Sequence, residues 1–375
     1  MFAVHELTAR SAELAGRRAA ELARVATSDP DFRTLPSPGS APEVGGLFDP
    51  GLADPSAEMV LEAAGELLSR AESAEPGCKV SGSVSVASSR GAFANSLGVS
   101  LASRSTSISA GCLAVIRRRG KSGSFYDFDM GRRAADVDLG AVGASAAGGA
   151  AGYLGGRSLP SCTMPVVLGP LAAAGLVEAV IGAASAESVQ RRRSFLVGRL
   201  GRRIASPKLS VLDDGLCPGG IYSSTFDAEG VARRPLAVIE DGVLRSLLHN
   251  SYTAGKAGAS STGHSTGGGC GPTNLRPRTG DCPAAEIIRG VKRGLYVNSA
   301  SLAPNPSSGD VSAMVEFGML IENGRLSGPV ANVSVGGSIF EMLEGIDAVS
   351  SDYRSEPGNI MPTIRIRKMH VSGSG

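Results

Sequence analysis

Residues 80–86, VSGSVSV, decide the fold class of the first half of the chain. Valine or glycine at the even positions alternates with serine at the odd ones, which is the pattern of a strand with one buried face. Segments 92–102, 106–116 and 123–129 continue the alternation, and Ser89-Arg90-Gly91 is a predicted turn. These segments predict an antiparallel meander packed on the helices that precede it.

The segments before the meander have helical spacing. Residues 2–27 predict one amphipathic helix that ends at Ser28-Asp29-Pro30. A connector rich in proline and glycine, 35–50, follows. Asp54-Pro55 predicts an N-cap with proline in the first turn, and the helix it opens ends at Pro76-Gly77.

The second half of the chain is rich in strands. An Ala/Gly-rich stretch, 134–157, is weakly helical and separates an N-terminal domain, 1–157, from a C-terminal domain, 158–375. Asp241-Gly242 and Asn323-Gly324 each lie between apolar alternating runs, which predicts hairpins. The predicted fold class is α+β. N-terminal helices with an antiparallel sheet are followed by a larger strand-rich domain with a barrel- or sandwich-like mixed sheet.

Composition and charge exclude several function classes. A net charge of +2 over 375 residues argues against a nucleic-acid partner. The arginine runs 117–119 and 191–193 are interpreted as solvated edges. Charge-free stretches at 139–156 and 158–177 lack the uninterrupted apolar run of a membrane span, so no membrane association is expected.

The cysteines and the N-terminal segment indicate the compartment. Six cysteines without a C-x-x-C spacing, in a chain of this length, are typical of reduced thiols. The N-terminal segment carries charges throughout and has no apolar core, which predicts no signal peptide. We therefore expect a cytoplasmic protein.

The histidines do not form a helical metal-binding pair. The four are His5, His249, His264 and His370, with no two one turn apart on a predicted helix. A zinc site assembled across the fold from His249, His264 and Cys270 remains an alternative, although loop histidines are more often ordinary polar residues.

Two polar segments are candidates for ligand binding. The glycine-rich run 261–271 could hold a phosphate or a peptide carboxylate with its backbone N–H groups, but a flexible surface loop is the more frequent explanation. It lacks a Walker pattern. In FDAEG (226–230), Asp227 and Glu229 would share a face on a strand, whereas in a turn both would be solvated. Without a partner histidine, the turn is favoured.

Ordered motifs across residues 170–375 carry a family resemblance. They are RRRSFLVGRLGRRI (191–204), FDAEGV (226–231), a run over 239–268, SGDVSAMVEFGMLIENGRL (308–326), VANVSVGGSIFEML (330–343) and PGNIMPTIRIRKMHVSG (357–373). The sequence resembles the TldD/PmbA family of peptidases, and within it the PmbA/TldE branch. The resemblance implies that the family's N-terminal layer is missing or much shortened in this chain.

Zinc-bearing members of this family carry H-E-x-x-x-H on a helix. Here that segment is VEAVIGA (177–183), on a helix predicted to begin at Pro170. Val177 and Gly182 stand where the histidines would be, and only Glu178 matches. The resemblance therefore implies that this chain has no catalytic residue and no metal of its own, and that a TldD-like partner subunit supplies the zinc.

The resemblance also implies the activity. It points to a heterodimeric peptidase or amide hydrolase that acts on small or unfolded peptides or peptide-like metabolites, with this chain inactive alone and shaping the substrate chamber. If the gene for this chain lay beside biosynthetic genes, that position would indicate a tailoring step in natural product biosynthesis. The candidate substrate-binding residues are Ser261, Thr262, Gly263, His264, Asp227 and Glu229. The alternatives are a non-catalytic binding or regulatory protein of the same fold, and a self-sufficient hydrolase.

Overall fold

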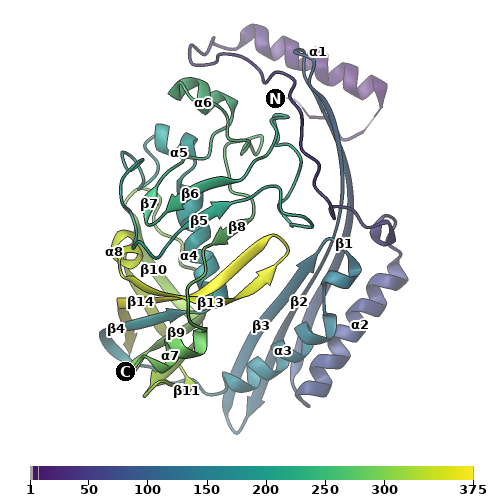
Figure 1. Cartoon of the computed structure of the whole chain (residues 1–375). Coiled ribbons are helices and arrows are strands. Elements are labelled where there is room, and N and C mark those ends of the chain that lie inside the picture. The colour runs from purple at the N-terminus through teal and green to yellow at the C-terminus, as the bar shows by residue number, and fades with distance from the viewer. Residues whose placement is uncertain (1–2, 7, 375) are drawn as a thin grey trace.

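A long antiparallel meander runs along one side of the molecule (Figure 1). In the computed structural model, which describes residues 3–6 and 8–374, it consists of β1 (Lys79–Ala94), β2 (Ser100–Arg118) and β3 (Lys121–Gly131). The predicted meander is confirmed. The turn predicted at Ser89-Arg90-Gly91 is wrong, because Arg90 pairs with Arg104 in an unbroken β1–β2 ladder. The predicted strand segment 92–102 is wrong too, because the chain reverses inside it, between Ala94 and Ser100.

The predicted alternation explains which face of the meander is buried. Val80, Val84 and Val86 lie on the face covered by α2 (Ala57–Ala74) and α3 (Leu139–Gly152). At Gly82 on this face, a Cβ atom would lie 2.8 Å from Leu67 Cδ2, so glycine permits the close approach of α2. The opposite side, which we call the free face, includes Ser81, Ser83, Ser85, Ser109, Leu113, Val115, Arg117, Ser122, Ser124 and Tyr126.

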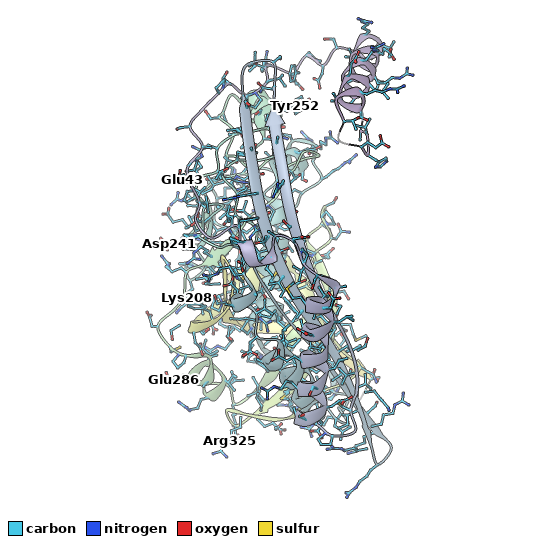
Figure 2. All side chains as sticks on the ribbon, turned by 90° about the vertical axis from the view of Figure 1, so that its right-hand side faces the viewer. Glu43, Lys208, Asp241, Tyr252, Glu286 and Arg325 are labelled. Atoms are coloured by element: carbon cyan, nitrogen blue, oxygen red, sulfur yellow. The ribbon has the colours of Figure 1, made fainter. Side chains whose placement is uncertain are left out.

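The two N-terminal helices differ from their predicted bounds. The first, α1 (Ala9–Val25), begins after its N-cap Thr8 and has no buried residue, so it does not pack on the meander. Figure 2 shows it standing apart from the rest of the chain. Residues 2 and 7 lie outside the described residues. The N-cap of α2 is Ser56, whose hydroxyl accepts from the Met59 N–H, and not Asp54.

The C-terminal part contains a barrel-like mixed sheet, as predicted. Among the described residues, one sheet has seven strands, of which β10, β12, β14, β4 and β9 close a ring with β4 and β9 parallel. The strands of this sheet are β4 (Pro160–Leu168), β9 (Arg293–Ala300), β10 (Asp310–Glu322), β11 (Arg325–Pro329), β12 (Val333–Ser338), β13 (Ile346–Glu356) and β14 (Asn359–Ser374).

Helices cover the ring and its surroundings. They are α4 (Pro170–Ala183), α5 (Ala186–Gln190), α6 (Ser251–Ala257), α7 (Ala284–Arg289) and α8 (Ile339–Glu344). The predicted helix start at Pro170 is confirmed, with proline in the first turn. No helix in the described part of the chain is long and apolar enough to cross a membrane.

Both predicted hairpins are confirmed. Asp241-Gly242 joins β6 (Leu236–Glu240) to β7 (Val243–Leu244), and Asn323-Gly324 joins β10 to β11. All four turn residues have positive φ, as the two-residue type I′ turn requires. With β5 (Val211–Asp213) and β8 (Leu275–Pro277), β6 and β7 form a four-stranded sheet within the described residues.

A buried arginine joins the meander to the C-terminal part. Arg132, 7% exposed, follows β3 and donates to the carbonyl oxygens of Thr106 in β2 and of Gly220, Ile221 and Ser223. Burial lowers the pKa of its guanidinium. Because these carbonyls come from both parts of the chain, Arg132 fixes loop 214–226 against the meander.

The substitution Arg132→Lys should lower the free energy of unfolding by about 2 to 3 kcal/mol, because one ammonium cannot satisfy carbonyls spread over two segments. Denaturant unfolding followed by circular dichroism measures the change. Arg133→Lys is the matched control: that side chain is exposed and pairs with Asp136, so the substitution should change the free energy of unfolding much less than Arg132→Lys does. Equal effects of the two substitutions would contradict the role of Arg132.

Candidate functional site

The meander lies beside the C-terminal part (Figure 1), and two cavities form the candidate site. A cavity of 380 Å³ separates β2 residues 102–105 from residues 223–225. A second cavity, of 440 Å³, lies at the start of α4 beside Tyr296, Asn298 and Arg354. Arg354 also donates to Asp127 Oδ1 of β3 at 2.9 Å, so β13 contacts the meander here. We call the region of these two cavities the cleft.

Helix α4 carries residues 177–183, where the resemblance predicts the family's zinc motif. Val177 is 3% exposed and packs in the core of the C-terminal part. Gly182 is half-buried, and a Cβ atom there would meet no atom within 4 Å. Glu178 is on the exposed side of the helix. Of the three positions, only Glu178 presents a polar side chain.

Glu178 belongs to a group of interacting side chains from three segments. Partial desolvation, and then the charge of Glu356 in β13, raise the pKa of Glu178. Desolvation likewise raises the pKa of Glu356, against the lowering effect of Arg354. Tyr222, from loop 214–226, has its pKa raised by desolvation and by both carboxylates. The three side chains therefore lie close enough to interact electrostatically.

The residues present do not fit the metal that the family implies. A valine and a glycine offer no zinc ligand at 177 and 182, which leaves one carboxylate. Across residues 3–6 and 8–374, no three His, Cys, Asp or Glu side chains are grouped to hold a metal ion. The alternative zinc site from His249, His264 and Cys270 is therefore wrong. His249 Nδ1 and Cys270 Sγ lie 3.2 and 3.8 Å from Thr253 Oγ1. The ring nitrogens of His264 instead face Thr262 and Asp213.

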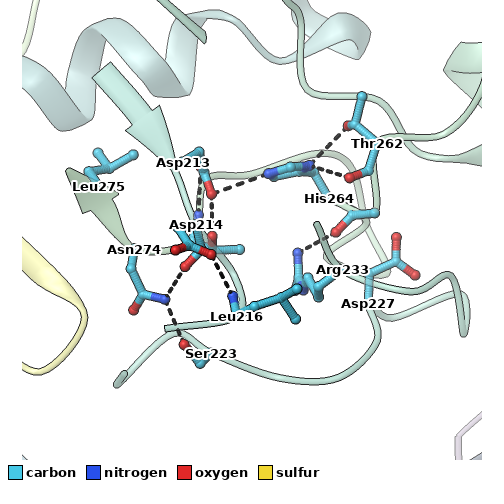
Figure 3. Close-up of polar contacts among 12 residues, drawn as sticks. Asp213, Asp214, Leu216, Ser223, Asp227, Arg233, Thr262, His264, Asn274 and Leu275 are labelled. Atoms are coloured by element: carbon cyan, nitrogen blue, oxygen red, sulfur yellow. Dashed lines mark hydrogen bonds and ion pairs between the residues drawn. The ribbon is translucent and has the colours of Figure 1, made fainter. Parts of the chain in front are cut away.

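The glycine-rich run is partly buried, so a flexible surface loop is the wrong description of residues 262–265. His264 is 1% exposed, and its Nδ1 lies 2.9 Å from both the hydroxyl and the carbonyl oxygen of Thr262 (Figure 3). Its Nε2 lies 3.2 Å from Asp213 Oδ1. Gly263 has φ +76, and a Cβ atom there would lie 2.6 Å from the Ala232 carbonyl oxygen. Residues 266–268 are the exposed part of the run.

Asp227 lies in a turn, as favoured, but it is buried rather than solvated. It is 2% exposed, and its carboxylate accepts from the N–H groups of Glu229, Val231 and Ser265 at 2.9–3.0 Å. Those backbone donors compensate the burial of the charge. Asp227 therefore connects the 226–231 turn to the glycine-rich run.

Glu229 and Gly230 extend these connections. Glu229 Oε2 accepts from the Ser251 N–H at 2.8 Å, at the start of α6. At Gly230, with φ +78, a Cβ atom would lie within 2.9 Å of side-chain atoms of Phe93 and Val99 at the tip of the β1–β2 hairpin. The turn therefore supports the tip of the meander, the glycine-rich run and α6 together.

The sequence interpretation missed several residues of this region. Asp213 and Arg233 belong to the network around the run, and Arg233 Nη1 donates to the Gly263 carbonyl oxygen at 2.6 Å. Arg354 lines the second cavity, and Tyr222 and Glu356 interact with Glu178 of α4. The sequence carries no signal for this group, because Tyr222 lies in a different segment from Arg354 and Glu356, which share β13. Whether Ser261, Thr262, Gly263, His264, Asp227 or Glu229 contacts a substrate stays a prediction.

Asp227→Asn should destabilise the protein by about 1 to 3 kcal/mol. Both carboxylate oxygens of Asp227 accept hydrogen bonds from backbone N–H groups, and the substitution replaces one of these oxygens by an NH₂ group that cannot accept. The glycine-rich run should also become more sensitive to limited proteolysis. Glu229→Gln is the control, because its amide oxygen can still accept from Ser251 and should leave both readouts nearly unchanged. An Asp227→Asn variant as stable and as resistant as the parent would show that Asp227 does not hold the run.

Known proteins resemble this chain over both parts. The family model described as the PmbA/TldA metallopeptidase C-terminal domain matches residues 161–373, and the one described as the central domain matches residues 53–151. Metalloprotease PmbA of Escherichia coli O157:H7 is 28% identical over 283 residues, which are 75% of this chain and 62% of that protein. A metalloprotease of Methanothermobacter thermautotrophicus is 32% identical over 235 residues, covering 57% of this chain and 51% of that protein. The chain thus spans about half to three-fifths of the length of these relatives.

Solved structures share the fold over nearly the whole chain. A putative modulator of a DNA gyrase from Thermotoga maritima has a TM-score of 0.88 at 25% identity, covering 96% of this chain and 83% of that one. TldE from Thermococcus kodakarensis has a TM-score of 0.90 at 23% identity, covering 99% and 86%. Because the C-terminal family model alone matches more than half of the residues, the chain belongs to the PmbA/TldD metallopeptidase family.

Proposed function

We propose that this chain is the zinc-less, TldE-like subunit of a heterodimeric, cytoplasmic hydrolase of the TldD/TldE type. A TldD-like partner supplies the zinc, and the pair cleaves small or unfolded peptides or peptide-like metabolites. One observation carries the proposal: in α4, the positions of the two motif histidines hold a buried valine and a glycine. The helix keeps its place in the core without the ligands that zinc chemistry needs.

In this proposal the chain binds and orients substrate in the cleft. The carboxylates of Glu178 and Glu356 and the hydroxyl of Tyr222 come from three segments and interact with one another. Carboxylates accept hydrogen bonds from peptide N–H groups, and the phenol can donate to a peptide carbonyl. An extended peptide along the free face would present both kinds of group.

The glycine-rich run has a different role from the one its composition suggested. Thr262 and His264 are buried, so they act by positioning the run. Ser261 and Glu229 are half-buried, and residues 266–268 are exposed, so these are the parts that a ligand can reach. A tailoring reaction in natural product biosynthesis would use the same surfaces.

Reconstitution with a partner tests the proposal. The chain is purified alone and together with a TldD-like subunit that carries H-E-x-x-x-H. Metal analysis and a peptide-hydrolysis assay are run on each preparation, with and without a chelator. We expect no stoichiometric zinc and no hydrolysis for the chain alone, and chelator-sensitive hydrolysis by the pair that exceeds that of the partner alone.

A matched control uses a partner whose motif glutamate is replaced by glutamine, which should abolish hydrolysis without preventing association. About one tightly held zinc per isolated chain would contradict the proposal. If the pair forms but the chain leaves the partner's hydrolysis unchanged, the alternative of a non-catalytic binding or regulatory protein would replace it.

A further inference from the structure

A cavity of 490 Å³ lies at the end of the meander where β2 turns into β3, against the outer side of β10. Its lining includes Arg117 and Ser122 from the free face, Glu316 and Phe317 from β10, and Asn332, which precedes β12. The lining includes no residue of α4, so this cavity is separate from the segment where the resemblance predicts the zinc motif. Its volume lies within the range of small-molecule sites, roughly 300–1,000 Å³.

The backbone around the cavity is irregular at two positions. In the β9–β10 ladder, Val315 pairs with Ala300 and Phe317 with Ser299, so Glu316 is the extra residue of a β-bulge. A bulge redirects a side chain and is frequent beside binding sites. Asn332 has φ +56, a conformation that costs free energy for a residue other than glycine. Both irregular residues face the same cavity.

Opposite charges line this cavity. Neither Arg117 nor Glu316 forms an ion pair with any residue of the described chain, although the adjacent Arg118 pairs with Glu75. Glu316 Oε2 accepts from the Ser299 hydroxyl at 2.8 Å, which orients the carboxylate and leaves further acceptor capacity. The guanidinium of Arg117 in β2 and the carboxylate of Glu316 in β10 are not paired with each other. Both can therefore bind a ligand that carries a negative and a positive charge.

An apolar wall completes the lining. Phe317 packs against Tyr153, with ring centroids 5.3 Å apart, and against Phe125 at 4.8 Å. Val115 lines the meander side. The aromatic packing fixes this wall, which an apolar side chain of a ligand could cover. Ser122 and Asn332 add uncharged hydrogen-bonding groups to the rim.

We propose that this cavity binds a short peptide with free termini, such as a dipeptide. The guanidinium of Arg117 holds the terminal carboxylate, the carboxylate of Glu316 holds the terminal ammonium, and an apolar side chain packs on Phe317. Arginine matches a carboxylate with two parallel hydrogen bonds. The site does not depend on the hydrolase activity proposed above, because all of its groups belong to this chain.

Titration calorimetry on the isolated chain with glycyl-leucine tests the site. We expect saturable one-to-one binding. N-acetyl-glycyl-leucine and glycyl-leucine amide each lack one terminal charge and should bind roughly ten- to a hundredfold more weakly. Glu316→Gln and Arg117→Gln should each weaken the binding of the unmodified dipeptide by a similar factor. Glu316→Gln should have little further effect on the binding of the acetylated dipeptide, because that ligand has no ammonium group for Glu316 to hold.

The matched control is Arg119→Gln, which removes the same charge two residues from Arg117 but outside the lining, and should bind as the parent does. Circular dichroism checks that each variant is folded. Absence of saturable binding to the parent would overturn the proposal. So would equal affinities for the free, acetylated and amidated dipeptides, or unchanged affinity in both cavity variants.

Discussion

The cleft depends on a buried cation that has no carboxylate partner among the described residues. The guanidinium of Arg132, which follows β3, is buried. Its hydrogen bonds go to carbonyl oxygens of β2 and of loop 214–226, which compensate the loss of its hydration. Burying a guanidinium is costly unless its donors are satisfied, so the two segments must keep their positions around it. The loop that carries Tyr222 is thereby held beside β2, and the meander is held beside the C-terminal part.

Other contacts hold the meander at different points along its length. Arg354 of β13 reaches Asp127 of β3, and Gly230 admits the tip of the β1–β2 hairpin. Because the same turn contains Asp227, the meander tip and the glycine-rich run are connected through a single carboxylate. The polar network that the sequence suggested as a ligand site therefore also connects the walls of the cleft, and its contact with a substrate stays a prediction.

The core packing of helix α4 does not require metal ligands. Val177 and its apolar neighbours in α4 pack in the core of the C-terminal part. The exposed side still presents Glu178 to Glu356 and Tyr222. In the proposed heterodimer, this packing would keep the shape of the substrate chamber while the partner performs the zinc chemistry.

Much of the fold was predictable because it follows local rules. The alternation from Val80, proline at the start of α4 and the two hairpin turns each depend on neighbouring residues. The turn at Arg90 was mispredicted because a serine-rich, glycine-containing segment was stabilised by its long ladder with β2. The burial of Asp227 and His264 could not be predicted, since their partners lie in other segments, such as Asp213 for His264.

The central claim is that this chain holds substrate in the cleft while the chemistry takes place on its partner. Hydrogen exchange on the reconstituted, chelator-treated pair, with and without a peptide substrate, tests it most directly. We expect the peptide to slow amide exchange in this chain over residues 214–226 and at the β13–β14 tip, 353–359. Protection confined to the partner subunit, with these segments unchanged, would contradict the claim.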